Sequence, residues 1–485
     1  MRFGAAAVLV GALAVPAAQR DSGFFPVAVD YPLDARTLSA EIARDLQAVR
    51  AAGFNTIKTT ISWREGEPVR GEYRFDALLR TVQTAGQYSL RVILQLDGTE
   101  PAWAATRYPP RERKNEPSAV GLGPCLDRRL RADLSEFVTT VVKTTSRFQS
   151  VLAIDVSGPP FDGLCDLVQI VASTHQAARR EVAVAGHARW PPPWLTRPAD
   201  LPSVDDWTVA GAVDRYGTRL DGSPLSSERA LAFDVIAGAS RRIGWWLYSG
   251  DVPESDRRFN AWLAIARGAQ GLIFDDPPRD TALVGTIARN QALFTQLRPR
   301  RAQVALLFDP SAPAGRADLA AAHQALYRRQ ITTDLHSVET LGGADLHGYR
   351  AIVATSTRAL PNQAREAIAL ARAAGAVYVD ASPPGDTVEA VVRAGLVPEV
   401  RIDGGTDVEV RFLESPTVQM IVGLNHASQS QRVTMVFAPE TQEAIWLNLD
   451  TGTGVNFVAG PTGPIHQYWF RPKDVLVLMI RKDIR

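Results

Sequence analysis

Short apolar segments alternate with amphipathic segments between residues 25 and 299. An apolar run at 27–31, for example, is followed within 38–49 by four apolar residues at helical spacing, and Gly53 then ends the predicted helix. We predict strands at residues 27–31, 56–63, 90–97, 151–157, 182–186, 209–216, 243–249 and 271–275. Eight strands separated mostly by helices favour a closed (β/α)8 TIM barrel over an open sheet.

Two smaller units follow the predicted barrel, which spans residues 21–300. Residues 301–399 alternate apolar strands with alanine-rich helices, which predicts a flavodoxin-like α/β domain with a mostly parallel sheet. From residue 400 to 485 the helical period vanishes, and β-rich runs are separated by Gly, Pro, Asn and Asp. This pattern predicts a small antiparallel β-sandwich domain.

The amino terminus has the pattern of a secretory signal. Arg2 precedes an apolar run from Ala5 to Val15, and small residues follow it. We expect residues 1–20 to be removed and the mature chain to be secreted or periplasmic. The remaining sequence contains no apolar stretch long enough to predict a membrane span.

The composition of the chain argues against several classes of function. The formal net charge is +1, so no basic excess favours a nucleic-acid partner. The two cysteines, Cys125 and Cys165, are too few for a disulfide scaffold or a four-ligand zinc site. No phosphate-loop, dinucleotide or nucleophile-elbow motif is present, and we predict no cofactor and no metal.

In a TIM barrel the functional residues lie at the carboxyl ends of the strands. The predicted strands bring six residues to this rim: Trp63, Asp97, Gly158, Tyr216, Ser249 and Asp275. For each carboxylate there, a salt bridge or a helix N-cap is the structural alternative to a functional role.

The segment from Ala52 to Asp76, AGFNTIKTTISWREGEPVRGEYRFD, resembles the clan A glycoside hydrolases, particularly the GH42-type β-galactosidases. Further similarities lie at Pro101–Trp103, Asp214–Thr218 and Leu263–Ala269, so the resemblance covers nearly the whole mature chain. It implies a sugar ligand and assigns the second unit to a trimerisation domain. A homotrimer is therefore expected.

The resemblance also implies an acid/base glutamate at the end of the fourth strand and a nucleophilic glutamate at the end of the seventh. Gly158 and Ser249 stand at these positions. A glycine has no proton to give, and a serine needs an adjacent base to act as a nucleophile. Asp155 and Asp251 are the candidate substitutes. Because both glutamates are replaced, the sequence predicts impaired hydrolysis.

The residues expected to bind a sugar combine flat aromatic rings with carboxylates near the predicted rim. They are Trp63, Asp97, Trp103, Tyr216, Trp246 and Asp275. The alternative for the tryptophans is that they fill the core. Glu65 and Glu67 lie in the loop after the second strand, and Glu67 is expected to be structural.

Three functions stay open at this point: a barrel that binds carbohydrate without efficient hydrolysis, an active β-galactosidase with displaced carboxylates, and a structural or assembly protein. The resemblance also places Cys125 and Cys165 at two of the four positions of a family zinc cluster. This implies that they are close in space, and export would favour a disulfide between them.

Overall fold

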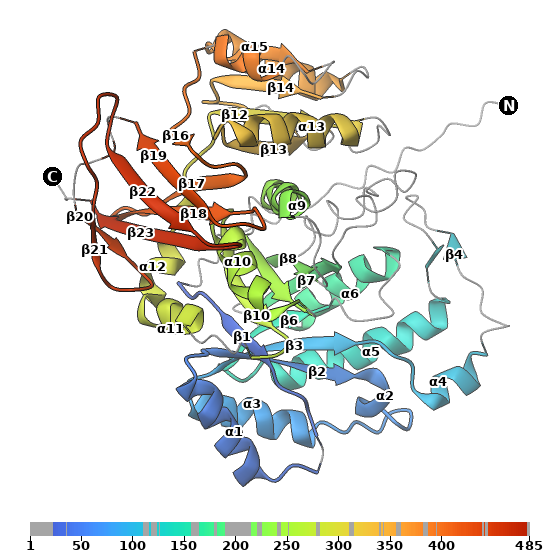
Figure 1. The fold of residues 1–485 in the computed structure, drawn as a ribbon. Coiled ribbons are helices and arrows are strands. Elements are labelled where there is room, and N and C mark those ends of the chain that lie inside the picture. The colour runs from blue at the N-terminus through green and yellow to red at the C-terminus, as the bar shows by residue number, and fades with distance from the viewer. Residues whose placement is uncertain are drawn as a thin grey trace, which may run out of the picture.

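The computed structural model describes residues 23–34, 36–109, 116–117, 124–125, 127–156, 164–178, 182–189, 215–220, 226–239, 244–250, 252–277, 282–309, 315–338, 341–342, 344–355, 360–381, 387–393, 395–438, 441 and 445–482 (Figure 1). Among these residues no helix has both the length and the apolar character needed to cross a membrane. The predicted signal segment lies outside the described residues and stays a prediction.

Eight parallel strands close into a barrel in the order β1-β10-β9-β8-β7-β6-β3-β2. They are β1 (Val27–Asp30), β2 (Thr56–Ser62), β3 (Arg91–Asp97), β6 (Val151–Asp155), β7 (Ala183–Arg189), β8 (Arg215–Leu220), β9 (Trp245–Ser249) and β10 (Ala269–Phe274). β1 pairs with both β2 and β10, which completes the ring. The predicted TIM barrel is confirmed.

Helices cover the barrel in the described part of the chain: α1 (Ser39–Ala51), α2 (Trp63–Gly66), α3 (Asp76–Gln87), α4 (Ala102–Arg107), α5 (Arg128–Thr145), α6 (Leu164–Ala177), α9 (Ser226–Ala239), α10 (Glu254–Ile265), α11 (Ala282–Arg289) and α12 (Gln291–Gln296). A two-stranded ribbon, β4 (Glu116–Pro117) with β5 (Pro124–Cys125), lies beyond α4. Gly53 follows α1 with φ +96°, a conformation that glycine adopts without strain. This supports the predicted end of the first helix.

The strands bury both faces, but the two faces differ in chemistry. Outward residues such as Ile57, Leu247 and Leu272 pack against the helices. The interior contains a smaller apolar cluster that includes Trp246 and Tyr248. Polar side chains, described below, occupy the interior near the carboxyl end.

One predicted strand is displaced. The sixth strand was expected at 209–216, but β8 runs from Arg215 to Leu220. Tyr216 is therefore near the amino-terminal end of its strand, and the expectation that it ends the strand was wrong.

The α/β domain contains a four-stranded parallel sheet in the order β13-β12-β14-β15. Its strands are β12 (Val304–Phe308), β13 (Thr333–Ser337), β14 (Ala351–Ala354) and β15 (Val377–Asp380), and its helices are α13 (Gly315–Arg328), α14 (Asn362–Ala373) and α15 (Thr387–Arg393). The sequence pattern predicts strands at residues 303–308, 351–355 and 377–380, which correspond to β12, β14 and β15, and it missed β13. The α/β architecture itself is confirmed.

The carboxyl-terminal domain packs two sheets around one apolar core. One sheet has the order β11-β17-β18-β23-β20-β21 and the other β16-β19-β22. The strands are β11 (Arg298–Pro299), β16 (Val400–Asp403), β17 (Val408–Glu414), β18 (Val418–Asn425), β19 (Gln431–Phe437), β20 (Ile445–Asn448), β21 (Gly454–Asn456), β22 (Ile465–Phe470) and β23 (Val475–Arg481). The antiparallel domain is as predicted. β11 precedes the α/β domain in the chain and links the barrel to this sheet.

Candidate functional site

A polar cavity of about 470 Å³ opens at the carboxyl ends of β1, β2 and β3. This volume is within the range of small-ligand pockets. The cavity is lined by Asp30, Pro32, Leu33, Thr60, Ser62, Arg64, Glu65, Asp97 and Thr99. Its position agrees with the rule that TIM-barrel sites lie at this end of the strands.

Lys58 lies beneath this rim between two carboxylates. Its Nζ is 3.0 Å from Asp30 Oδ1 and 3.4 Å from Asp275 Oδ1, and its side chain is 5% exposed. A buried ammonium is stable only when it is paired. The pairing therefore fixes two carboxylates from β1 and from the end of β10 around one cation.

Asp97 is the last residue of β3, as predicted, and lines the cavity. Its Oδ1 accepts hydrogen bonds from the backbone N–H and the hydroxyl of Thr99, at 2.8 and 2.6 Å. This turn holds the carboxylate in a fixed orientation at the rim. Fixed acceptors of this kind suit a ligand that presents hydroxyl donors.

Asp155, a candidate substitute for the missing acid, ends β6 and is completely buried. Tyr248 in β9 is 1% exposed, and burial together with the neighbouring carboxylate of Asp155 raises the pKa of Tyr248 well above its ordinary value. Asp155 thus interacts with Tyr248 inside the barrel, below the rim. A carboxylate in this position does not contact a ligand in the cavity directly.

The tryptophans expected to form sugar platforms have other roles. Trp63 is fully buried, and its Nε1 donates to Glu67 Oε2 at 2.8 Å. Trp246 is 3% exposed and belongs to the apolar cluster of the barrel interior. Neither presents a ring face to solvent, so the structure contradicts the sugar-platform role for both and supports the core-filling alternative.

Trp103 holds the loop after β2, which contains Glu67, in place. It is partly exposed, its Nε1 donates to the backbone oxygen of Glu67 at 2.8 Å, and its ring packs edge-on against Trp63. Glu67 also accepts from the backbone of Gly71 at 2.7 Å. Glu67 is thus an anchor of the loop after β2, in agreement with its predicted structural role.

The position of the expected nucleophile is occupied by Ser249, the last residue of β9, which is 3% exposed. In β9, Trp245 and Leu247 face the helices, whereas Trp246 and Tyr248 face the interior. By this alternation Ser249 belongs to the outward face. Gly158, Asp251 and the side chains of Tyr216, Cys125 and Cys165 lie outside what the structure describes.

Lys58, Asp30 and Thr60 were not predicted as site residues. The signal was present in β2, which reads TIKTTIS and places polar residues at alternate positions. In a barrel strand one set of alternate positions faces the interior. A lysine in that set requires a carboxylate partner, and Asp30 and Asp275 supply it. No group of three or more potential metal ligands occurs within the described ranges.

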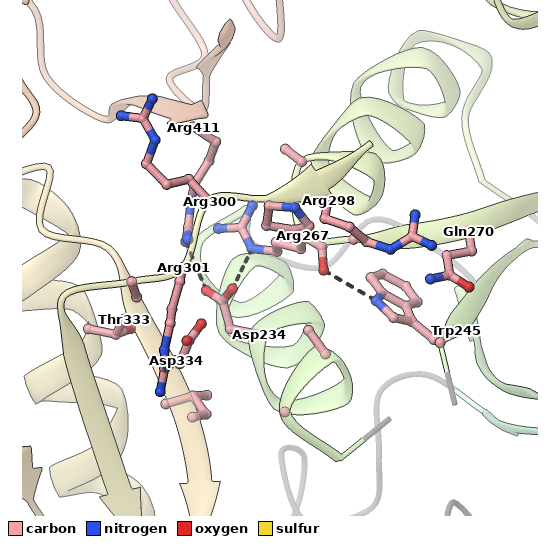
Figure 2. Close-up of a pocket in the computed structure, with 18 of the residues that line it drawn as sticks. Asp234, Trp245, Arg267, Gln270, Arg298, Arg300, Arg301, Thr333, Asp334 and Arg411 are labelled. Carbon is pink, nitrogen blue, oxygen red and sulfur yellow. Dashed lines mark hydrogen bonds and ion pairs between the residues drawn. The ribbon is translucent and has the colours of Figure 1, made fainter. Parts of the chain in front are cut away.

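A second pocket, of about 500 Å³, lies where the three domains meet (Figure 2). It includes Gly244, Trp245 and Gln270, which are at the amino-terminal ends of β9 and β10, opposite the rim cavity. Five arginines line it: Arg267, Arg298, Arg300, Arg301 and Arg411. Two of them, Arg267 and Arg411, belong to an ion-pair network that joins the domains.

The centre of this network is the buried guanidinium of Arg267. It pairs with Asp234 of α9 at 3.1 Å and with Glu409 of β17 at 2.6 Å. Arg411 contacts the same two carboxylates, and His323 of α13 contacts Asp234 at 2.8 Å. Although burial alone would raise them, the guanidinium groups of Arg267 and Arg411 hold the pKa of Asp234 below, and that of Glu409 well below, the ordinary value.

The fold and the rim cavity together define a TIM-barrel protein with its site at the carboxyl end of the strands and two additional domains. Residues 31–121 match the model of glycoside hydrolase family 42, described as β-galactosidase. Over nearly its whole length the protein shares the fold of solved β-galactosidases, among them a GH42 enzyme. No curated protein gives a significant match.

Three similar solved structures illustrate this fold. The β-galactosidase from Bacillus circulans sp. alkalophilus is 12% identical, with 95% of this chain and 99% of that chain covered and a TM-score of 0.71. A catalytic mutant of Gan42B, a GH42 β-galactosidase from G. stearothermophilus, is 12% identical, with 95% and 98% covered and a TM-score of 0.67. The β-galactosidase from Halorubrum lacusprofundi is 13% identical, with 93% and 98% covered and a TM-score of 0.63.

Proposed function

We propose that the protein binds β-galactosides or related glycans in the cavity at the carboxyl ends of β1, β2 and β3, and that hydrolysis is impaired. The observation that carries this proposal is the cavity itself, where Asp30, Glu65 and Asp97 offer carboxylate acceptors in a β-galactosidase fold. Sugar hydroxyls donate well to such fixed acceptors.

Impairment follows from the residues at the two catalytic positions. The catalytic mutant of Gan42B replaces a glutamate with alanine in a protein of this fold. In the present chain Gly158 and Ser249 occupy the positions that the family resemblance assigns to the two glutamates. A retaining glycosidase requires two carboxyl groups about 5–5.5 Å apart, and neither residue supplies one.

Calorimetric titration with methyl β-galactoside tests the binding. We expect saturable binding by the wild type and at least roughly tenfold weaker binding by Asp97→Asn, because one charged acceptor is lost. Arg301→Gln, in the interdomain pocket, is the matched control and should bind like the wild type. If Asp97→Asn binds methyl β-galactoside as tightly as the wild type, the sugar does not bind in this cavity.

An active glycosidase with displaced carboxylates is the second candidate. It is favoured by Asp30 and Asp275, which meet at one ammonium near the rim. Asp251 remains a further candidate. Release of nitrophenol from an aryl β-galactoside by the wild type, abolished in Asp275→Asn or Asp251→Asn, would support this candidate over the first.

We also propose that the protein is exported and forms a homotrimer. A structural role in an assembly is the third candidate function. The α/β domain exposes Val377 in its edge strand β15, Leu370 in α14, Val392 in α15 and Val397 after α15. Exposed apolar residues beside an unpaired strand edge favour self-association. Light scattering should give three times the chain mass, and a monomer at micromolar concentration would contradict the trimer.

A further inference from the structure

The outer face of the sheet β16-β19-β22 carries an exposed indole. Trp469 is 61% exposed and lies near the end of β22, an edge strand. Phe470 belongs to the domain core, with Tyr468 packed against it. By strand alternation, Gln467 and Trp469 therefore share the opposite, solvent-facing side.

Planar polar groups flank the indole. Arg432 of β19 stands directly opposite Trp469 in the sheet register, and its guanidinium donates to Gln467 Oε1 at 3.0 Å. The hydrogen bond joins the guanidinium and the amide on the same face of the sheet as Trp469. In the adjacent strand Asp403 stands opposite Thr434 and is paired with Arg401 at 3.2 Å.

These groups match the two sides of a pyranose. An exposed tryptophan leaves apolar surface in water, and stacking a ligand on it removes that surface. The C–H face of a sugar ring suits the indole, while its hydroxyls suit an amide, a guanidinium and a carboxylate. Galactose presents such an apolar face, because its axial O4 leaves H3, H4 and H5 together on the other side of the ring.

The surface is a sheet face that is open on all sides, whereas the cavity at the barrel rim is a depression bounded by side chains of the rim. An open face accommodates the interior of a polymer, whereas a cavity of about 470 Å³ accommodates a chain end. Arg401 and Asp403 pair with each other, so the face does not require a charged ligand. β22 and the rim at β2 also lie far apart in the molecule (Figure 1).

We propose that Trp469, Gln467 and Arg432 form a second carbohydrate site, which binds a neutral β-linked galactan chain independently of the barrel. The site would hold the protein on polymeric galactan while the rim cavity takes up terminal sugars.

Affinity electrophoresis in native gels containing soluble β-1,4-galactan tests the proposal. We expect the galactan to retard the wild type, and Trp469→Ala to raise the apparent dissociation constant roughly tenfold or more. Leu447→Ala removes another exposed apolar side chain of the same domain and should migrate like the wild type. Equal thermal unfolding of the variants verifies that they are folded.

The variant Asp97→Asn distinguishes galactan binding at the sheet site from sugar binding in the barrel cavity. Retardation that persists in Asp97→Asn but disappears in Trp469→Ala supports the sheet site, even if the barrel binds no sugar. The proposal is overturned if galactan fails to retard the wild type, if Trp469→Ala is retarded equally, or if Asp97→Asn alone abolishes retardation.

Discussion

At the scale of single residues, the structure centres on one buried lysine. Lys58 is enclosed by the barrel and neutralised by Asp30 and Asp275, which are 33% and 25% exposed at their side chains. Removing the cation leaves two carboxylates facing each other without compensation. Solvent at the rim partly screens that repulsion.

We therefore predict that Lys58→Met lowers the free energy of unfolding by about 1–3 kcal/mol, less than the loss typical of a fully buried pair. Lys482→Met is the control, because Lys482 pairs with Glu414 at the surface and both are about one-third exposed. Its loss should stay below about 1 kcal/mol. Urea denaturation measures both, and equal losses would refute the special role of Lys58.

Trp63 gives a second test at this scale. Trp63→Phe removes the indole donor to buried Glu67, so we predict a loss of about 1–3 kcal/mol in stability. Because the indole is buried, the affinity for methyl β-galactoside should be unchanged. A sugar affinity that falls while thermal stability is retained would restore the sugar-platform role that the sequence suggested.

The aromatic roles could not be predicted because barrel strands bury both faces. β9 reads WWLYS, a continuous apolar run without alternation. Nothing in that run distinguishes Trp246, which fills the barrel, from Trp245, which packs on the helices. By contrast, Asp97 was located correctly because a charged residue after an apolar run marks the end of a strand.

At the scale of elements, α9 and β13 form a close contact between the barrel and the α/β domain. A Cβ atom on Gly238 would stand 2.4 Å from the backbone oxygen of Leu335. Only glycine allows the helix to approach this strand so closely. β13 itself was missed in the sequence, because its segment TDLHS lacks a continuous apolar run.

We predict that Gly238→Ala destabilises the protein by about 1–3 kcal/mol, since the helix must move away from the strand. Gly86→Ala, in α3, is the matched control. There the new Cβ would be 3.6 Å from Ser150, an ordinary contact, and the change should stabilise by about 0.5–1 kcal/mol. Thermal unfolding compares the two, and a neutral Gly238→Ala would contradict the contact.

At the scale of the whole molecule, the charged network between the domains explains how the three units hold together. The sequence predicted the three architectures from their periodicity. It could not predict the network, because Asp234, Arg267 and Glu409 are far apart along the chain and meet only after folding.

The network predicts a pH dependence of stability. Asp234 and Glu409 have lowered pKa values in the folded protein, so their contribution is present above the pKa of about 4 in the unfolded chain and is lost as the pH falls through the folded values. Glu409→Gln should lose about 3–5 kcal/mol at pH 7, because Arg267 stays buried without one partner. Its stability should also fall less steeply in acid than that of the wild type. If the free energy of unfolding of Glu409→Gln and of the wild type falls equally steeply with decreasing pH, this account is refuted.

The central claim is that the barrel binds a β-galactoside and that its hydrolysis is impaired. One proton NMR time course of lactose with the purified protein measures both properties. We predict saturation transfer from the protein to the galactosyl protons, with the anomeric signals of lactose constant over hours. The appearance of free galactose signals would show hydrolysis, and the absence of saturation transfer would exclude binding, so either result would contradict the claim.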